Sequence, residues 1–241
     1  MLKIPHKKPS NINISNCFIC LFLYFSLSLN LYAQTNQLEQ DQYRVDEFLR
    51  DIRMDHVEAV KKKLRDGLSP NVVDSKGNSA LLVAITEKSL KTATLLMSVP
   101  SIDLNKPNIA NETPVMLAAL NGYEELVVDL VDKYDVELNK PGWTVLHYAV
   151  LNGRLSMTEY LLNHHAYIDA LSPNGTTPLM LAARAGHIHI VKLLLDRGSD
   201  ITIKNAVGMT VIEFAESGNQ SEIALGLRSR WVKLFGTPYT N

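Results

Sequence analysis

Histidines and acidic residues stand close together at several points of this sequence, and such residues bind metals or transfer protons in enzymes. His187 and His189 are separated by one residue, and Glu124 and Glu125 are adjacent. Two residues apart on a helix, the two imidazole rings do not face each other, so they are unsuited to holding one metal ion. The adjacent glutamates are typical of a solvated helix surface. We therefore predict no metal site and no catalytic site among these residues.

Motifs for phosphate binding and for nucleophilic catalysis are also missing from the sequence. It has no glycine-rich phosphate loop, no helical zinc-protease motif and no nucleophile elbow. Both cysteines, Cys17 and Cys20, lie near the N-terminus, and the net charge of −1 excludes a strongly basic nucleic-acid-binding protein. We predict a protein that is not an enzyme and takes no cofactor, metal, small-molecule substrate or nucleic acid. An enzyme, or an accessory subunit of one, is the alternative.

Residues 1–33 have the layout of a secretory signal peptide. Basic residues stand at positions 3, 7 and 8, an uncharged and mostly apolar run extends from Cys17 to Ala33, and the small Ala33 precedes Gln34. An uncleaved membrane anchor is the alternative, although the apolar run is shorter than the roughly 20 residues that a spanning helix needs. The glutamine-rich residues 34–42 are expected to form a flexible lead-in.

After this lead-in, the sequence repeats itself about every 33 residues. Four positions keep the same kind of residue through five successive units. A hydroxyl residue recurs at Ser79, Thr113, Thr144, Thr177 and Thr210. Glycine or asparagine stands two positions before each of them, at Gly77, Asn111, Gly142, Gly175 and Gly208. An alanine follows each hydroxyl residue by five positions and a leucine follows it by seventeen, so each unit is expected to share one local structure.

These positions predict a helical hairpin in each unit. The hydroxyl group is suited to accept a hydrogen bond from an orphan backbone N–H at the start of the first helix, where Pro114 and Pro178 also fit. The glycine or asparagine suits a positive φ in a tight turn. An apolar stripe such as Ile190, Val191 and Leu194 predicts a second helix. Because one hairpin cannot bury its apolar face alone, the units are expected to stack into a solenoid.

The clearest copy of the unit runs from Thr177 to Ala183 with the sequence TPLMLAA, and Thr113–Ala119 and Thr144–Ala149 are two further copies. These segments resemble the ankyrin repeat. The resemblance implies an all-α, L-shaped solenoid of stacked helix-turn-helix units with hairpin-like fingers. The predicted boundaries are 43–235 for the ankyrin-repeat domain, with a cap at 43–74, repeats at 75–107, 108–138, 139–171, 172–204 and 205–235, and a C-terminal tail at 236–241.

The two ends of the domain depart from the repeat as capping units do. In the N-terminal cap, Asp46 takes the hydroxyl position and Asp51 takes the position of the small alanine, which suits a face that meets water. In the last repeat, Glu213 makes the first helix more polar. Beyond it, Trp231, Leu234 and Phe235 are expected to fold over the terminal repeat.

One finger is shorter than the others. Six positions separate Pro107 from Thr113 in one finger, and three separate Pro141 from Thr144 in the next. The finger that leads to Thr144 has therefore lost three tip residues, which is expected to leave a notch in the row of fingers. It carries Trp143 directly before the hydroxyl residue.

In the ankyrin family, partners usually contact the finger tips and the exposed side of the first helices. Carried over to this chain, those positions predict the residues that bind a partner. They are Ile109, Glu112, Leu120, Asn121, Trp143, Leu151, Asn152, Thr176, Arg184 and Met209. Leu120 and Leu151 are equivalent in adjacent units, and with Trp143 nearby they have the composition of an interaction hot spot. The alternative is that the short finger drops Trp143 onto the body of the domain as part of the core.

Together, these features predict an exported, monomeric ankyrin-repeat scaffold or regulator that binds a protein partner. The leader and the resemblance to exported bacterial ankyrin proteins favour the periplasm. Secretion, or an inner-membrane anchor if the leader is not cleaved, is the alternative. The sequence does not identify the partner.

Overall fold

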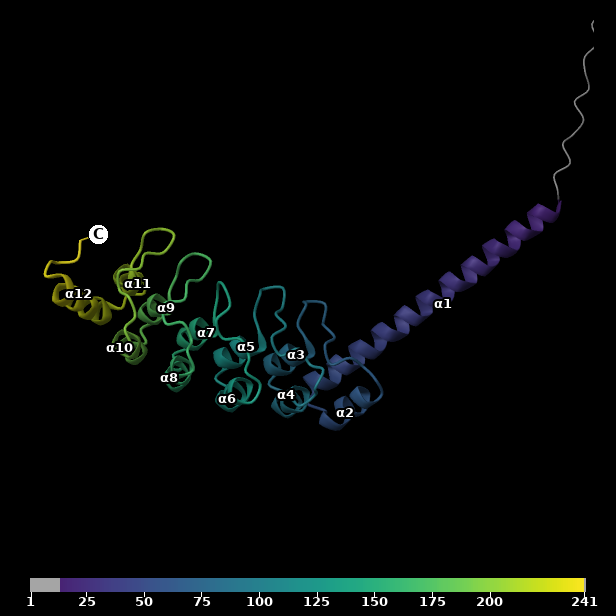
Figure 1. Cartoon of the computed structure of the whole chain (residues 1–241), viewed down its shortest axis with the longest axis horizontal. Helices are drawn as coiled ribbons and strands as arrows, with labels where there is room; N and C mark the ends of the chain where they lie inside the picture. The colour runs from purple at the N-terminus through teal and green to yellow at the C-terminus, as the bar shows by residue number, and fades with distance from the viewer. Residues whose placement is uncertain (1–13, 241) are drawn as a thin grey trace, which may run out of the picture. The chain divides into compact units, whose positions relative to one another are not determined.

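The computed structural model describes residues 14–240, and within that range the regular secondary structure is helical, with loops and fingers between the helices (Figure 1). The helices are α1 (Ile14–Arg53), α2 (Val57–Arg65), α3 (Ala80–Thr86), α4 (Leu90–Met97), α5 (Pro114–Asn121), α6 (Glu124–Asp132), α7 (Val145–Leu151), α8 (Leu155–Asn163), α9 (Pro178–Ala185), α10 (Ile188–Asp196), α11 (Val211–Ser217) and α12 (Ser221–Phe235). The described residues form no strand, only an isolated bridge between Val73 and Ser79. The predicted all-α fold is confirmed.

The chain divides into two compact units within α1, the first ending at Glu47 and the second beginning at Phe48. The compact repeat domain therefore begins five residues after Tyr43, which is 64% exposed. The basic residues predicted to open the signal peptide lie outside the described residues. In the part of the chain that the structure describes, no helix combines the length and the apolar character needed to cross a membrane.

Residues 34–42 continue helix α1, so the expectation of a flexible lead-in is wrong for this structure. The helix runs on because no proline or glycine interrupts it. Side chains one turn apart also pair along it. Gln37 donates to Asp41 and Gln42 donates to Asp46, at 3.2 and 2.9 Å.

Two layers of helices and a row of fingers make up the second unit (Figure 1). Each first helix packs against the first helix of the next repeat, in the order α3, α5, α7, α9 and α11. The alanine that recurs in these helices is completely buried in every repeat, at Ala84, Ala118, Ala149, Ala182 and Ala215. At the N-terminal end, Phe48 and Ile52 from the last turns of α1 are also completely buried. The predicted close approach of neighbouring helices therefore explains the alanine.

The turn before each first helix has the predicted geometry. Backbone φ is positive at Gly77, Asn111, Gly142, Gly175 and Gly208. The hydroxyl groups of Ser79, Thr177 and Thr210 accept from backbone N–H groups in the first turns of their helices, as expected of capping residues. Three positions later, an acceptor side chain reaches back to the N–H of the capping residue. That acceptor is Met116, His147, Met180 or Glu213 in the last four repeats.

The loop between the two helices of a repeat also requires a glycine. Gly153 has a φ of +68°, and a Cβ atom placed on it would lie 2.8 Å from the ring of His187 in the next repeat. The His187 ring also makes a hydrogen-bonding contact of 3.2 Å from Nε2 to the carbonyl of Leu151. Gly153 therefore allows both a left-handed turn and the approach of the next hairpin.

The C-terminal tail is docked on the last repeat. Tyr239 is only 9% exposed, and its hydroxyl donates to the carboxylate of Glu213 and lies 3.0 Å from the hydroxyl of Thr210. The ring of Trp231 meets Tyr239 edge-on, with centroids 4.8 Å apart. Trp231 therefore packs against the docked Tyr239, whereas Leu234 and Phe235, which were expected to cover the repeat, stay 58% and 48% exposed. Residues 236–240 are therefore part of the cap rather than a separate tail.

Candidate protein-binding face

The short finger is built differently from the other four. In those, a backbone N–H donates to the carbonyl four residues later, as Asn108 does to Glu112 and Ser172 does to Thr176, both at 3.0 Å. Among the described backbone hydrogen bonds, none closes the short finger in this way. Its missing tip residues therefore remove the hairpin and leave Trp143 next to the body of the repeat.

Trp143 packs on its own repeat without being fully enclosed. Its ring lies edge-on to the rings of His147 and Tyr148, at centroid distances of 5.2 and 6.4 Å. It is 36% exposed. Trp143 is therefore not a fully buried core residue. Its indole packs against the start of α7 and also stays partly exposed to solvent.

His147, in α7, lies beneath Trp143 and forms hydrogen bonds to two finger residues. It is completely buried; its Nδ1 accepts from the Thr144 N–H at 3.2 Å, and its Nε2 donates to the carbonyl of Thr176 at 3.0 Å. This pair of contacts requires the neutral ring with its proton on Nε2. Burial lowers the pKa of His147, against the hydrogen bond to Thr176, which raises it. Trp143 therefore rests on a rigid, uncharged support.

Tyr148 and Glu112 connect the short finger to the repeat before it. The Tyr148 hydroxyl donates to Glu112 at 2.9 Å, and the second oxygen of Glu112 accepts from the side chain of Asn108 at 2.9 Å. Burial raises the pKa of Tyr148, and the neighbouring carboxylate raises it further. The phenol therefore stays protonated and remains a donor to Glu112, so this bond positions the two side chains across the repeats.

Leu120 and Leu151 end neighbouring first helices, α5 and α7, which pack together. The side chain of Asn152 spans them by donating to the carbonyl of Leu120 at 3.1 Å. Leu151 is 45% exposed and Leu120 is partly exposed. The structure therefore places both leucines at the same end of adjacent helices.

The remaining predicted site residues divide by exposure. Ile109 is 85% exposed at its finger tip, and Asn121 and Arg184 are exposed at the ends of their first helices. Met209 is only partly exposed, and Thr176 is 2% exposed. Thr176 is therefore not available for direct contact with a partner. Thr176 is buried because its backbone carbonyl accepts a hydrogen bond from His147 and its N–H donates one to the hydroxyl of Ser172.

Sequence reasoning missed one row of this face. Four residues after the hydroxyl, the three central repeats carry Leu117, Tyr148 and Leu181, which are partly exposed, whereas Val83 and Phe214 at the two ends are buried. The repeat register would have found the row, because this position carries a large side chain in all five repeats. We call Trp143, Tyr148, Leu120 and Leu151 the central apolar face.

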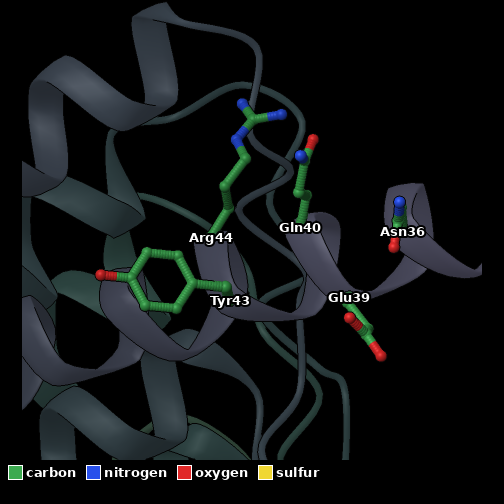
Figure 2. Close-up of a pocket in the computed structure, with 5 residues that line it drawn as sticks. All are labelled: Asn36, Glu39, Gln40, Tyr43 and Arg44. Atoms are coloured by element: carbon green, nitrogen blue, oxygen red, sulfur yellow. The ribbon is translucent and has the colours of Figure 1, made fainter.

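Residues 14–240 contain no group of three or more histidines, cysteines and acids placed to hold a metal. A separate hollow on α1 is lined by Asn36, Glu39, Gln40, Tyr43 and Arg44. Figure 2 shows that all five come from this one helix and leave it in different directions. That hollow has no convergent polar groups, which a ligand site needs.

Comparison with known families agrees with this geometry. A model described as ankyrin repeats, in three copies, matches residues 52–140 and 115–205. The chain belongs to the ankyrin-repeat family. Ankyrin repeats are typical protein–protein interaction modules.

Individual ankyrin-repeat proteins resemble the chain over much of its length. The B-cell lymphoma 3 protein homolog of Mus musculus is 29% identical over 170 residues, which are 68% of this chain and 38% of that protein. The protein mask-1 of Caenorhabditis elegans, named for ankyrin repeats and a KH domain, is 31% identical over 151 residues, or 58% of this chain and 6% of the relative. This chain thus spans well under half of either relative.

A solved structure has the same fold. The crystal structure of the ankyrin repeat domain of Bcl-3 matches with a TM-score of 0.63 and 25% identity. The match covers 74% of this chain and 81% of that domain.

Proposed function

We propose that this ankyrin-repeat chain is a non-catalytic scaffold or regulator that binds one protein partner through the central apolar face. The observation that carries the proposal is the short finger, which leaves Trp143 36% exposed beside Tyr148. Leu151, at the end of the same helix, is 45% exposed. Tryptophan and tyrosine are among the residues that contribute most of the binding energy at protein interfaces. The support beneath them is already rigid, so little side-chain ordering opposes association.

The test is affinity capture from the native compartment with a charged substitution on this face. Leu151→Glu is expected to abolish capture of the partner. Leu155→Glu is the matched control, because Leu155 is 41% exposed but lies in α8, in the layer of second helices. Both variants should melt within about 3 °C of the parent, since exposed substitutions cost at most about 0.5 kcal/mol.

Two outcomes would contradict this assignment. If both variants capture the partner equally well, binding does not use the central apolar face. If Leu151→Glu abolishes capture but also lowers the melting temperature by much more than about 3 °C, the loss of capture comes from a weakened fold, and Leu151 packs within the domain.

For the location, we propose export to the periplasm after cleavage behind Ala33. The proposal rests on the basic start, the uncharged apolar run and the small residue at its end. N-terminal sequencing of the protein purified from its own cells tests it. A chain that begins at Gln34 supports export, and an intact leader contradicts it.

A further inference from the structure

A second hollow lies in the layer of second helices, between α10 and α12. Its floor is apolar and includes Val191 and Leu195 from α10 and Ile223 from α12, each no more than 9% exposed. Figure 1 shows α10 and α12 on the side of the first helices away from the fingers. The hollow is therefore separate from the central apolar face.

One wall of this hollow is a glycine with open space around it. Gly226 lines it, and a Cβ atom added there would meet nothing within 4 Å. At the same position, the three preceding repeats carry Leu193, Tyr160 and Asp129. A glycine inside a helix costs about 1 kcal/mol relative to alanine. Gly226 therefore makes α12 less stable at a position where the three preceding repeats carry a side chain.

Polar contacts cross the interfaces between α6 and α8 and between α8 and α10, whereas another hollow lies between α4 and α6. Tyr160 on α8 donates to Asp132 on α6 at 2.8 Å. Arg197, after α10, donates to Asn163 at 2.9 Å and contacts Glu159 at 3.4 Å. Between α10 and α12, the contact that the structure gives is from the Arg230 side chain to the carbonyl of Leu195, at 3.0 Å. The middle of this groove stays open.

The rim of the groove is basic. Lys192, Arg230 and Lys233 line it, and Glu222 is the single acid among the lining residues. Lys192 and Lys233 are exposed, and no ion pair of either is found among the described residues. A groove with this rim attracts a negatively charged occupant.

We propose that this groove binds an amphipathic helix of a second protein whose apolar stripe is flanked by acidic residues. A groove with an apolar floor between two helices can receive a third helix along its apolar face. Glutamates or aspartates on both sides of that stripe would then meet Lys192 and Lys233. The protein would thereby hold two partners at once, one on the central apolar face and one on the opposite layer.

The test measures binding of two labelled helical peptides to the full chain by fluorescence anisotropy. Each has about 18 residues, or five turns, with leucines along one stripe. The flanks carry glutamates in one peptide and lysines in the other. We expect the glutamate peptide to bind at least about tenfold more tightly, and added salt to weaken it by screening.

Matched variants locate the binding site. Lys192→Glu with Lys233→Glu should weaken the glutamate peptide about tenfold or more, whereas Lys204→Glu, at another exposed lysine, should not. Gly226→Leu should block the groove, and Gly226→Ala should keep binding while it stabilises α12. Circular dichroism verifies that each variant is folded.

The proposal is overturned by any of three results: the two peptides bind equally, Gly226→Leu binds like the parent, or the lysine reversals have no effect. Binding to vesicles of anionic phospholipid without binding of the glutamate peptide would also overturn it, in favour of a lipid surface.

Discussion

Tyr148 on α7 and Glu112 in the preceding finger are joined by a hydrogen bond of 2.9 Å that crosses from one repeat to the next. The phenol ring also meets Trp143 edge-on. The one shortened finger of the chain is therefore fixed on both sides, through Tyr148 to the repeat before it and through His147 to the repeat after it. This rigidity supports the assignment of the central apolar face as a preformed binding surface.

Tyr148→Phe should weaken partner binding more than it weakens the fold. Loss of one hydrogen bond to a charged group is expected to lower the free energy of unfolding by about 1.5–3 kcal/mol at most, because Glu112 keeps its contact with Asn108. Tyr160→Phe is the control, since Tyr160 makes an equivalent bond to Asp132 in the layer of second helices. Urea unfolding gives the stability of each variant. Equal capture of the partner by both variants would argue against a role for Tyr148 at the interface.

The stability of the domain should fall as the pH drops below about 6.5, in part through His147. Burial lowers the pKa of His147 in the folded state, whereas the unfolded ring keeps its ordinary value near 6.5. The unfolded state therefore takes up a proton first as the pH falls, and stability is lost below 6.5 until the folded ring is also protonated. Melting temperatures measured between about pH 5 and 8 follow this loss.

His147→Met separates this effect from other titrations. Methionine already occupies the same position in two repeats, where Met116 and Met180 accept from the capping N–H. The variant should lose about 1 kcal/mol at neutral pH with the bond to Thr176, and its stability should depend less on pH between 5 and 7. An unchanged pH dependence would show that another group is responsible.

Removing the hydroxyl of Tyr239 should destabilise the last repeat. Burial alone would raise the pKa of Glu213, but hydrogen bonds from Thr210 and Tyr239 lower it. Tyr239→Phe is expected to cost about 1–2 kcal/mol near neutral pH. A lowered carboxylate pKa contributes stability at neutral pH that is lost on acidification, so the difference from the parent should shrink as Glu213 becomes protonated. Urea unfolding at several pH values measures this, and no difference at neutral pH would contradict the docked tail.

Gly153→Ala should cost more stability than Gly198→Ala. Both glycines have positive φ, so either substitution carries backbone strain of about 1–2 kcal/mol. At Gly153 the new methyl group also meets the His187 ring, whereas a Cβ on Gly198 meets nothing within 4 Å. We expect about 1 kcal/mol more loss at Gly153. Thermal unfolding of the two variants provides the comparison, and equal losses would show that the loop moves to make room.

Local patterns in the sequence determine much of this fold. The hydroxyl, glycine and alanine positions act within one hairpin or between neighbours, so their period alone indicated caps, turns and stacked helices. The continuation of α1 through residues 34–42 and the docking of Tyr239 were not predicted. The first depends on the summed helix propensity of polar residues, and the second on one contact between residues 26 positions apart.

For the candidate site, the repeat register predicted exposed positions better than contacts. Trp143, Leu120 and Leu151 are all at least partly exposed in the structure. The register could not show that Thr176 is buried, because that depends on hydrogen bonds from His147 and Ser172. It also did not show that Trp143 both packs and stays exposed, which follows from how three lost residues change the path of one finger.

Photo-crosslinking at position 151 tests the central claim most directly. A photoreactive phenylalanine analogue replaces Leu151 in one protein and Leu155 in another, and both are irradiated in the native compartment. We predict a crosslink to one protein partner from position 151 and none to that partner from position 155. A crosslink from position 155 alone, or none from position 151 while the partner is still captured, would contradict binding through the face that Trp143, Tyr148 and Leu151 form.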